Sequence, residues 1–133
     1  MKKQGIINAQ LAGYLAALGH KDLFMIADAG MPIPKGIPIV DLALTYGIPS
    51  FTQVMDAILK EVCVEEYVIA EEINTYNQDL LAYIRKALPD IPAKTIPHDE
   101  LKKSMVDLKF VIRTGENTPY PNIVLKAGCA FFS

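Results

Sequence analysis

The feature that most constrains the fold is an uninterrupted apolar run, Leu23 to Ala27, which ends at Asp28. The run lacks the polar alternation of a strand with one solvated face, so it predicts a β-strand covered on both faces. A strand of that kind needs layers of other elements on either side. The stretch that follows, residues 29–38, holds three prolines and two glycines. Because proline lacks an amide donor, this stretch is predicted to be a long ordered loop.

Helical and strand-like patterns alternate along the rest of the chain. Asn8 is predicted to cap the first helix and Gly19 to end it in a left-handed C-cap. Ser50 and Gln53 match a capping box at the start of another helix. From apolar spacing and turn residues, the expected helices are 8–19, 50–62, 77–88 and 99–105, and the expected strands are 23–27, 39–42, 67–70, 93–96, 110–113 and 123–126.

This alternation favours the α/β class. We expect a three-layer α/β/α domain with a mostly parallel central sheet. The chain is 51% hydrophobic over 133 residues, which is enough apolar material for one compact core, so residues 1–133 are expected to form a single domain.

Composition argues against several partners. Lys and Arg number 13 against 15 Asp and Glu, a formal charge of −2, so the chain lacks the basic excess that binding to nucleic acid requires. No apolar run approaches the ~18 to 20 residues that cross a bilayer. The start lacks the apolar segment of a secretion signal, so a cytoplasmic protein is expected. Cys63 and Cys129 stand far apart among apolar neighbours and are interpreted as free packing residues.

Few residues are suited to chemistry, and each also has an ordinary structural explanation. His20 and His98 are the only histidines and both fall at junctions beside predicted strands, where α/β folds place binding crevices; each could equally be a surface histidine. Asp28 ends a buried strand, so it must be solvated, paired or hydrogen-bonded, and capping a loop would satisfy it. The pair Glu71-Glu72 is interpreted as charge at a strand end or helix start rather than a general-acid pair.

Tyr120 stands between Pro119 and Pro121 in the loop before the last predicted strand. The two prolines fix the backbone and so limit where the phenol can point. A rigid ring flanked by Asn117 and Asn122 suits a polyhydroxy ligand, because the ring can stack on a sugar face while the amides exchange hydrogen bonds with hydroxyls. The alternative is a hydrophobic plug with turn-forming asparagines.

Other chemistries lack their motifs. The sequence contains no His-x-x-x-His spacing and no cysteine cluster, so no metal site is expected. It contains neither a glycine-rich phosphate loop nor a Gly-x-Ser-x-Gly elbow. What remains is acid–base chemistry on a neutral polar molecule, without a cofactor.

Seven separated blocks of the sequence carry a family resemblance. They are Lys2-Lys3 with Gly5 and Asn8, Leu18–Asp22, Ile26–Pro34, Ala70–Ile73, His98–Glu100 with Lys102-Lys103, Val111–Glu116, and Thr118–Asn122. In order, spacing and residue type they resemble the D-ribose pyranase family, which includes the related fucose mutarotases. The resemblance covers essentially the whole chain, and a shared α/β pattern alone does not explain it.

The resemblance implies roles for six residues. His20 would be the catalytic acid–base group, and the sugar-binding residues would be Asp28, His98, Tyr120 and Asn122, with Lys102 a weaker candidate. Asp28 would then be able to hold His20 in one tautomer or raise its basicity.

The resemblance also implies an activity and an assembly. The family opens and recloses the ring of D-ribose, converting the β-pyranose into the β-furanose that a downstream kinase uses, with no cofactor. It assembles as rings of subunits stacked into a homodecamer of two pentamers. The apolar segment Ala130-Phe131-Phe132 also favours a high-order oligomer, because it would otherwise be exposed.

Some features separate the branches and the alternatives. The run Ala29-Gly30-Met31-Pro32 is similar to the ribose branch of the family, so ribose is favoured. Gln4 and Pro121 depart from the usual residues, and Pro121 removes a backbone donor. The alternatives are a non-catalytic sugar-binding or regulatory module of ribose uptake, and a structural ring protein with an incidental pocket. His20 favours the isomerase over the binding module, because a mere binder has no need of a titrating group beside the anomeric carbon. The matched polar positions argue against the structural ring protein.

Overall fold

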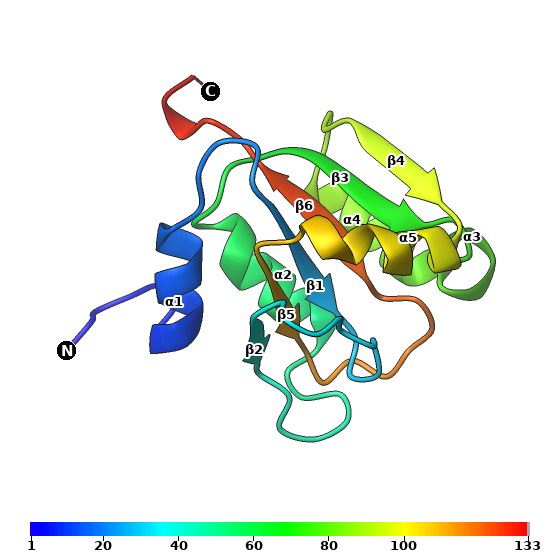
Figure 1. Ribbon diagram of the computed structural model, residues 1–133, viewed down its shortest axis with the longest axis horizontal. Helices are drawn as coiled ribbons and strands as arrows, with labels where there is room; N and C mark the ends of the chain where they lie inside the picture. The colour runs from blue at the N-terminus through cyan, green and yellow to red at the C-terminus, as the bar shows by residue number, and fades with distance from the viewer. Residues whose placement is uncertain (133) are drawn as a thin grey trace.

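The computed structural model describes residues 1–132, and their strands pair into one six-stranded sheet. The order across the sheet is β2-β5-β1-β6-β3-β4. Five strands run in the same direction, and β6 runs antiparallel between β1 and β3 (Figure 1). The expected mostly parallel sheet is therefore confirmed. The strands are β1 (Leu23–Ala27), β2 (Ile39–Asp41), β3 (Val64–Ala70), β4 (Ala93–Ile96), β5 (Phe110–Arg113) and β6 (Ile123–Ala127).

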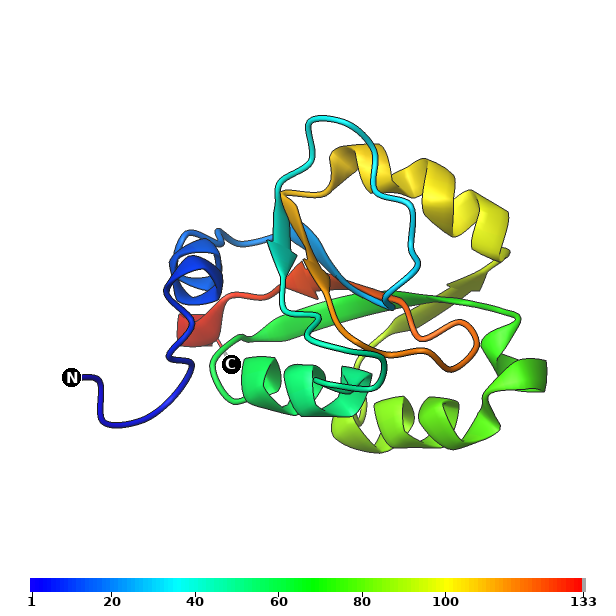
Figure 2. The same cartoon turned by 90° about the horizontal axis from the view of Figure 1, so that it is seen from below.

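Helices cover both faces of this sheet, as the α/β/α prediction requires. Figure 2 shows α2 and α4 on one side, with α5 and the cyan loop 29–38 on the other. The helices are α1 (Ala9–Ala16), α2 (Phe51–Leu59), α3 (Ile73–Tyr76), α4 (Gln78–Ala87) and α5 (His98–Ser104), with 3-10 turns at Met105–Asp107 and Ala130–Phe132. No helix within residues 1–132 is long and apolar enough to span a membrane.

Strand β1 supplies side chains to two hydrophobic cores. Phe24 and Ile26 point to the core under α1, α2 and α4, whereas Met25 and Ala27 point to the core under α5. All four are fully buried. The loop 29–38 adds Met31 to the α5 side. Burial on both faces explains why β1 has no polar alternation in its sequence.

The predicted helix starts are confirmed in atomic detail. The Asn8 side chain accepts a hydrogen bond from the Leu11 amide at 2.9 Å. In the capping box, Ser50 Oγ accepts from the Gln53 amide at 3.2 Å, and Gln53 Oε1 accepts from the Ser50 amide at 2.9 Å. These local side-chain bonds satisfy amides that a helix start otherwise leaves unpaired.

The predicted end of the first helix is wrong. The helix ends at Ala16 and not at Gly19, and Gly19 does not adopt a left-handed conformation. Instead, the Asp22 carboxylate accepts a hydrogen bond from the Gly19 amide at 2.8 Å, and the left-handed residue of the turn is Lys21, with φ 74°. The aspartate organises this turn, so the special backbone conformation falls two residues after the glycine.

The cysteines are free thiols, as predicted, and both Cys63 and Cys129 are half-buried. The short helix α3 has no counterpart in the prediction. Four residues are too few for an apolar period to show, and its single buried side chain is Ile73.

Candidate functional site

The candidate site is built where β1 ends and β6 begins. Because these strands are antiparallel neighbours, Asp28, just after β1, lies beside Asn122, just before β6. The Asp28 amide donates to Asn122 Oδ1 at 2.9 Å, and Asn122 Nδ2 donates to Asp28 Oδ2 at 3.0 Å. Asn122 is completely buried. This reciprocal pair joins the two strands through side chains at the point where their backbone pairing stops.

The surrounding loops hold this pair in place. Asp28 Oδ1 accepts a further hydrogen bond from the Gly30 amide at 2.9 Å, which orients the carboxylate. The buried Thr114 donates from its hydroxyl to the Ala27 carbonyl at 2.8 Å and accepts from the Glu116 amide at 3.1 Å. Asp28 is thus the turn-capping aspartate that its position after a strand predicted. Lone pairs on its two oxygens still remain for a ligand.

Tyr120 and His98 form the aromatic wall of the site. Their rings meet edge to face, with centroids 5.1 Å apart and an interplanar angle of 78°. Tyr120 has φ 58°, in the left-handed region, and its carbonyl accepts from the Asn122 amide at 2.9 Å. The Tyr76 ring of α3 also lies near Tyr120, with the ring centroids 5.7 Å apart.

His98 is the first residue of α5, and its backbone is anchored by a distant carboxylate. The His98 amide donates to both Glu72 oxygens, at 3.0 and 3.1 Å. Its ring Nδ1 is buried and has no hydrogen-bond partner within residues 1–132.

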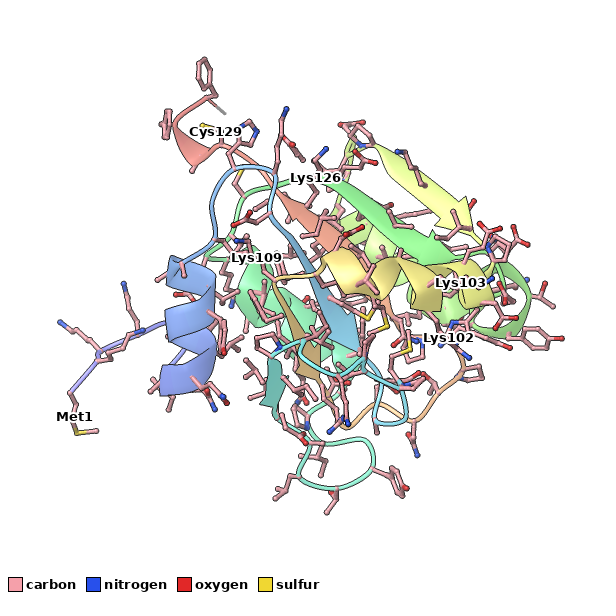
Figure 3. The ribbon with its side chains drawn as sticks, in the orientation of Figure 1. Met1, Lys102, Lys103, Lys109, Lys126 and Cys129 are labelled. Carbon is pink, nitrogen blue, oxygen red and sulfur yellow. The ribbon has the colours of Figure 1, made fainter. Side chains whose placement is uncertain are left out.

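Lys102 lies one turn along α5 from His98, on the same face of the helix. Its ammonium is 3.7 Å from Asp99, and the side chain is partly exposed. Figure 3 shows Lys102 at the α5 end of the molecule, whereas Lys126 and Cys129 lie at the other end of the sheet.

His20 lies at that other end, away from the remaining candidates. It precedes β1, and the amide of the next residue, Lys21, bonds to the carbonyl of Ala127 at the end of β6. Asp28 follows β1, and the strand alone advances about 13 Å between its terminal Cα atoms, at roughly 3.3 Å per residue. The prediction that Asp28 holds the His20 ring is therefore wrong for a single chain, because the two residues flank opposite ends of one strand.

Glu65, on β3, is the carboxylate that His20 contacts. His20 Nε2 lies 2.9 Å from Glu65 Oε2, and 47% of the His20 side chain is exposed. The same cluster continues through Lys126, 3.8 Å from Glu65 and 3.6 Å from Glu66. A hydrogen bond from Lys94 lowers the pKa of the Glu66 carboxyl below its ordinary value, and the charge of Lys126 adds to the effect. The His20 end is therefore densely charged.

The sequence did not predict the long-range contacts of several residues near the candidate residues. Glu72 was correctly interpreted as charge at a helix start, but its bond to the distant His98 amide has no local signal. The same holds for Glu65 and Asn77, whose partners are 45 and 41 residues away. Within residues 1–132, no group of three or more His, Cys, Asp or Glu side chains is placed to hold a metal ion.

Comparison with known proteins gives consistent matches over nearly the whole chain. Residues 1–130 match the model of the RbsD / FucU transport protein family. D-ribose pyranase 1 of Rubrobacter xylanophilus is 50% identical over 131 residues, which are 98% of this chain and 100% of that protein. D-ribose pyranase of Lactiplantibacillus plantarum is 47% identical over the same shares.

Solved structures match as well. Bacillus subtilis RbsD complexed with D-ribose superposes with a TM-score of 0.94 and 42% identity, over 98% of this chain and 100% of that one. The fucose mutarotase of Streptococcus pneumoniae in complex with L-fucose has a TM-score of 0.76 at 18% identity, over 93% of this chain and 94% of that one, which shows a shared fold.

Proposed function

The chain belongs to the RbsD / FucU transport protein family, and from that premise we propose that it is a sugar-ring isomerase that interconverts the β-pyranose and β-furanose forms of D-ribose. The observation that carries the proposal is the group formed by Asp28, Asn122, His98 and Tyr120, which sets hydrogen-bonding groups beside an aromatic wall. The names of the full-length relatives, and the ribose bound to the B. subtilis protein, support the same substrate.

The reaction needs only proton transfers. On opening, the anomeric hydroxyl loses its proton, the bond from C1 to the ring oxygen breaks, and that oxygen gains a proton. On closing, a different hydroxyl loses its proton as it bonds to C1, and the carbonyl oxygen is protonated. The sugar is neither oxidised nor reduced. A histidine that titrates near neutrality can take either role, and such positioned groups accelerate reactions by typically about 10² to 10⁴.

The binding roles follow from the free hydrogen-bonding capacity of each group. Asp28 retains lone pairs that can accept from sugar hydroxyls, and the His98 ring has a nitrogen, Nδ1, without a protein partner. Tyr120 offers a stacking face together with a hydroxyl. Asn122 orients Asp28 from a buried position, and Lys102 stands one helical turn from His98 as a further donor.

We assign the catalytic acid–base role to His20, supplied by a second copy of the chain. What supports a shared site is the separation of His20 from Asp28 by the length of β1, together with the exposure of the His20 ring. Contact between the His20 end of one copy and the Asp28 end of the next is head to tail, and such contacts form a ring when the rotation between neighbouring copies closes. The exposed Phe131 and Phe132 fit an associating chain.

The full proposal is a cytoplasmic homodecamer of two stacked pentameric rings, which supplies the furanose to phosphorylation in ribose catabolism. Sedimentation at micromolar concentration is expected to give a species about ten times the 14.7 kDa chain mass. A monomer at that concentration would contradict the shared site.

Magnetisation transfer in proton NMR tests the activity. Saturating a pyranose anomeric signal of D-ribose should reduce the furanose anomeric signals in the presence of the protein, well beyond the reduction in its absence. Ribose binding without transfer would instead identify a non-catalytic sugar-binding or regulatory module. The absence of both would contradict the proposed function.

A further inference from the structure

Asn77 links the helical layer to the loop that carries Tyr120. It lies between α3 and α4, and its Nδ2 donates to Thr118 Oγ1 at 3.1 Å and to the Pro119 carbonyl at 2.8 Å. These partners are 41 and 42 residues further along the chain. Both partners immediately precede Tyr120, so the Asn77 side-chain amide fixes the segment that leads into this residue of the aromatic wall.

The Asn77 side chain does not cap the helix that follows it, although Asn77 stands at the N-cap position. Asparagine is among the best residues at a helix N-cap, because its side chain can accept from an amide of the first turn. Asn77 is the N-cap residue of α4, yet it makes no capping hydrogen bond, and its backbone has φ −151° and ψ 61°. Helix α4 therefore lacks a side-chain cap from Asn77, and the Asn77 side chain bonds to the loop that carries Tyr120 instead. Departures from a local rule of this kind occur mostly at functional sites.

The backbone of Tyr120 is where such support is needed. Its φ of 58° is unfavourable for an aromatic L-residue, and conformations of this kind persist only where the surroundings hold them. The Pro119 carbonyl belongs to the same rigid peptide plane as the Tyr120 amide. The bond from Asn77 to that carbonyl therefore fixes the plane about which the Tyr120 φ is set.

Two residues of the segment 72–77 other than Asn77 contact the aromatic wall. The preceding residue, Tyr76, places its ring 5.7 Å from the Tyr120 ring. At the other end of α3, Glu72 holds the amide of His98. The segment 72–77 therefore contacts the backbone of His98, the ring of Tyr120 and the carbonyl that precedes Tyr120.

We infer that Asn77 is a positioning residue for sugar binding, which holds the Tyr120 ring in its site-forming orientation through the Pro119 carbonyl and the Thr118 hydroxyl. The inference rests on the proposed function for its substrate and adds a residue to the site. Loss of Asn77 is expected to weaken ribose binding while leaving the proton-transfer step of bound ribose largely intact.

The variant Asn77→Asp is the sharpest test. It keeps the size of the side chain and a strong helix-capping oxygen, and it removes the Nδ2 donor. The matched control is Asn74→Asp, which removes the same donor from an exposed asparagine of α3 whose Nδ2 donates to the nearby Glu71 carbonyl. The variant Asn77→Ala removes the donor without adding charge.

Three measurements on the full-length protein are compared. By titration calorimetry, both Asn77 variants should bind D-ribose about 3- to 10-fold more weakly, and Asn74→Asp should bind as the wild type does. At saturating ribose, pyranose–furanose exchange by magnetisation transfer should change by less than about twofold. Without ribose, amide hydrogen exchange in the peptide covering residues 117–123 should be faster in both Asn77 variants.

The outcomes separate this inference from the proposed function. If the wild type exchanges ribose and the Asn77 variants match it in affinity and in amide exchange, Asn77 has no positioning role. A loss of affinity equal to that of Asn74→Asp would reduce Asn77 to a general structural residue and would also overturn the inference. If the wild type binds ribose without exchanging it, the proposed activity fails, while affinity and amide exchange still decide the role of Asn77.

Discussion

Asp28 and Asn122 exchange two hydrogen bonds at the end of the sheet. The Asp28 amide donates to Asn122 Oδ1 at 2.9 Å, and Asn122 Nδ2 donates to Asp28 Oδ2 at 3.0 Å. The exchange requires one side chain that both accepts and donates, because it faces a backbone N–H and a carboxylate at once. Only an amide supplies both in that space. Because Asn122 is fully buried, water cannot replace either bond.

Asn122→Asp should destabilise the protein markedly. It keeps the acceptor for the Asp28 amide, but it places a buried carboxylate, in place of a donor, against the half-buried Asp28 carboxylate. We expect the free energy of unfolding to fall by about 2 to 4 kcal/mol. Urea denaturation measures it, with Asn117→Asp, at an exposed position of the same loop, as the control. Equal stability of the two variants would contradict the importance of the pair.

Gly115→Ala should be destabilising through a backbone clash. A Cβ at this position would lie 2.5 Å from the carbonyl oxygens of Thr45 and Ile48, and backbone cannot move aside as a flexible side chain can. A loss of about 2 to 3 kcal/mol in the free energy of unfolding is expected.

The matched control for that variant is Gly13→Ala. Gly13 lies inside α1 with nothing within 4 Å of the added Cβ, so alanine there should stabilise the helix by about 1 kcal/mol. Thermal unfolding of the two variants should therefore shift in opposite directions. A shift of Gly115→Ala in the stabilising direction would show that the loop 45–49 does not pack on Gly115 as described.

Tyr83 on α4 donates its hydroxyl to Asp56 on α2, at 2.6 Å to Oδ1. This hydrogen bond, with a smaller contribution from burial, raises the Tyr83 pKa above its ordinary value of 10.0. A raised pKa in the folded state means that the phenol contributes stability below about pH 10, and that the contribution is lost as the pH rises through the folded-state pKa.

The stability difference between wild type and Tyr83→Phe should accordingly be constant between about pH 7 and 9 and should shrink above about pH 10. The difference should be small, because the tyrosine is 37% exposed. Urea denaturation over this pH range measures it. A difference that grows with alkalinity would have the wrong sign for this hydrogen bond.

Most of the fold could be predicted because its signals are local. The unbroken apolar run of β1 predicts a buried strand, and Ser50 and Gln53 alone predict the capping box of α2. The end of α1 was predicted wrongly, because the Gly19 amide bonds to the Asp22 side chain and Gly19 does not form the expected left-handed C-cap. The helix α3 is too short for any periodic pattern.

The family resemblance predicted candidate site residues, and the structure adds how they are arranged. The family resemblance singled out Asp28, His98, Tyr120 and Asn122, and the structure brings them together at one end of the sheet. Their supports Glu72 and Asn77 act over 26 or more residues, so no local pattern reveals them. The separation of His20 from Asp28 was already implied by the predicted strand 23–27, because His20 precedes this strand and Asp28 follows it.

Tyr120→Ala should chiefly weaken ribose binding, because it removes a stacking face and a hydroxyl. A loss of about 1 to 3 kcal/mol in binding free energy is expected. Titration calorimetry measures it, and Tyr83→Phe, on the α2 and α4 side of the sheet, should bind ribose as the wild type does. Unchanged affinity on removing Tyr120 would place the sugar elsewhere.

Catalysis at a site shared between copies is the central claim, and mixed assemblies test it most directly. His20→Ala should keep its fold, since about half of the side chain is exposed to solvent. It should bind ribose nearly normally and lose exchange by about 10² or more. The double variant His98→Ala, Tyr120→Ala keeps His20 but should not bind ribose. Each alone should be inactive in anomeric magnetisation transfer.

When the two variants are unfolded together and reassembled in equal amounts, some interfaces unite an intact His20 with an intact binding end. Random mixing should restore about a quarter of the wild-type exchange rate per site. Such recovery, with none when each variant is reassembled alone, is the predicted result. Mixed assemblies that form and remain inactive, beside an active wild type, would contradict the account.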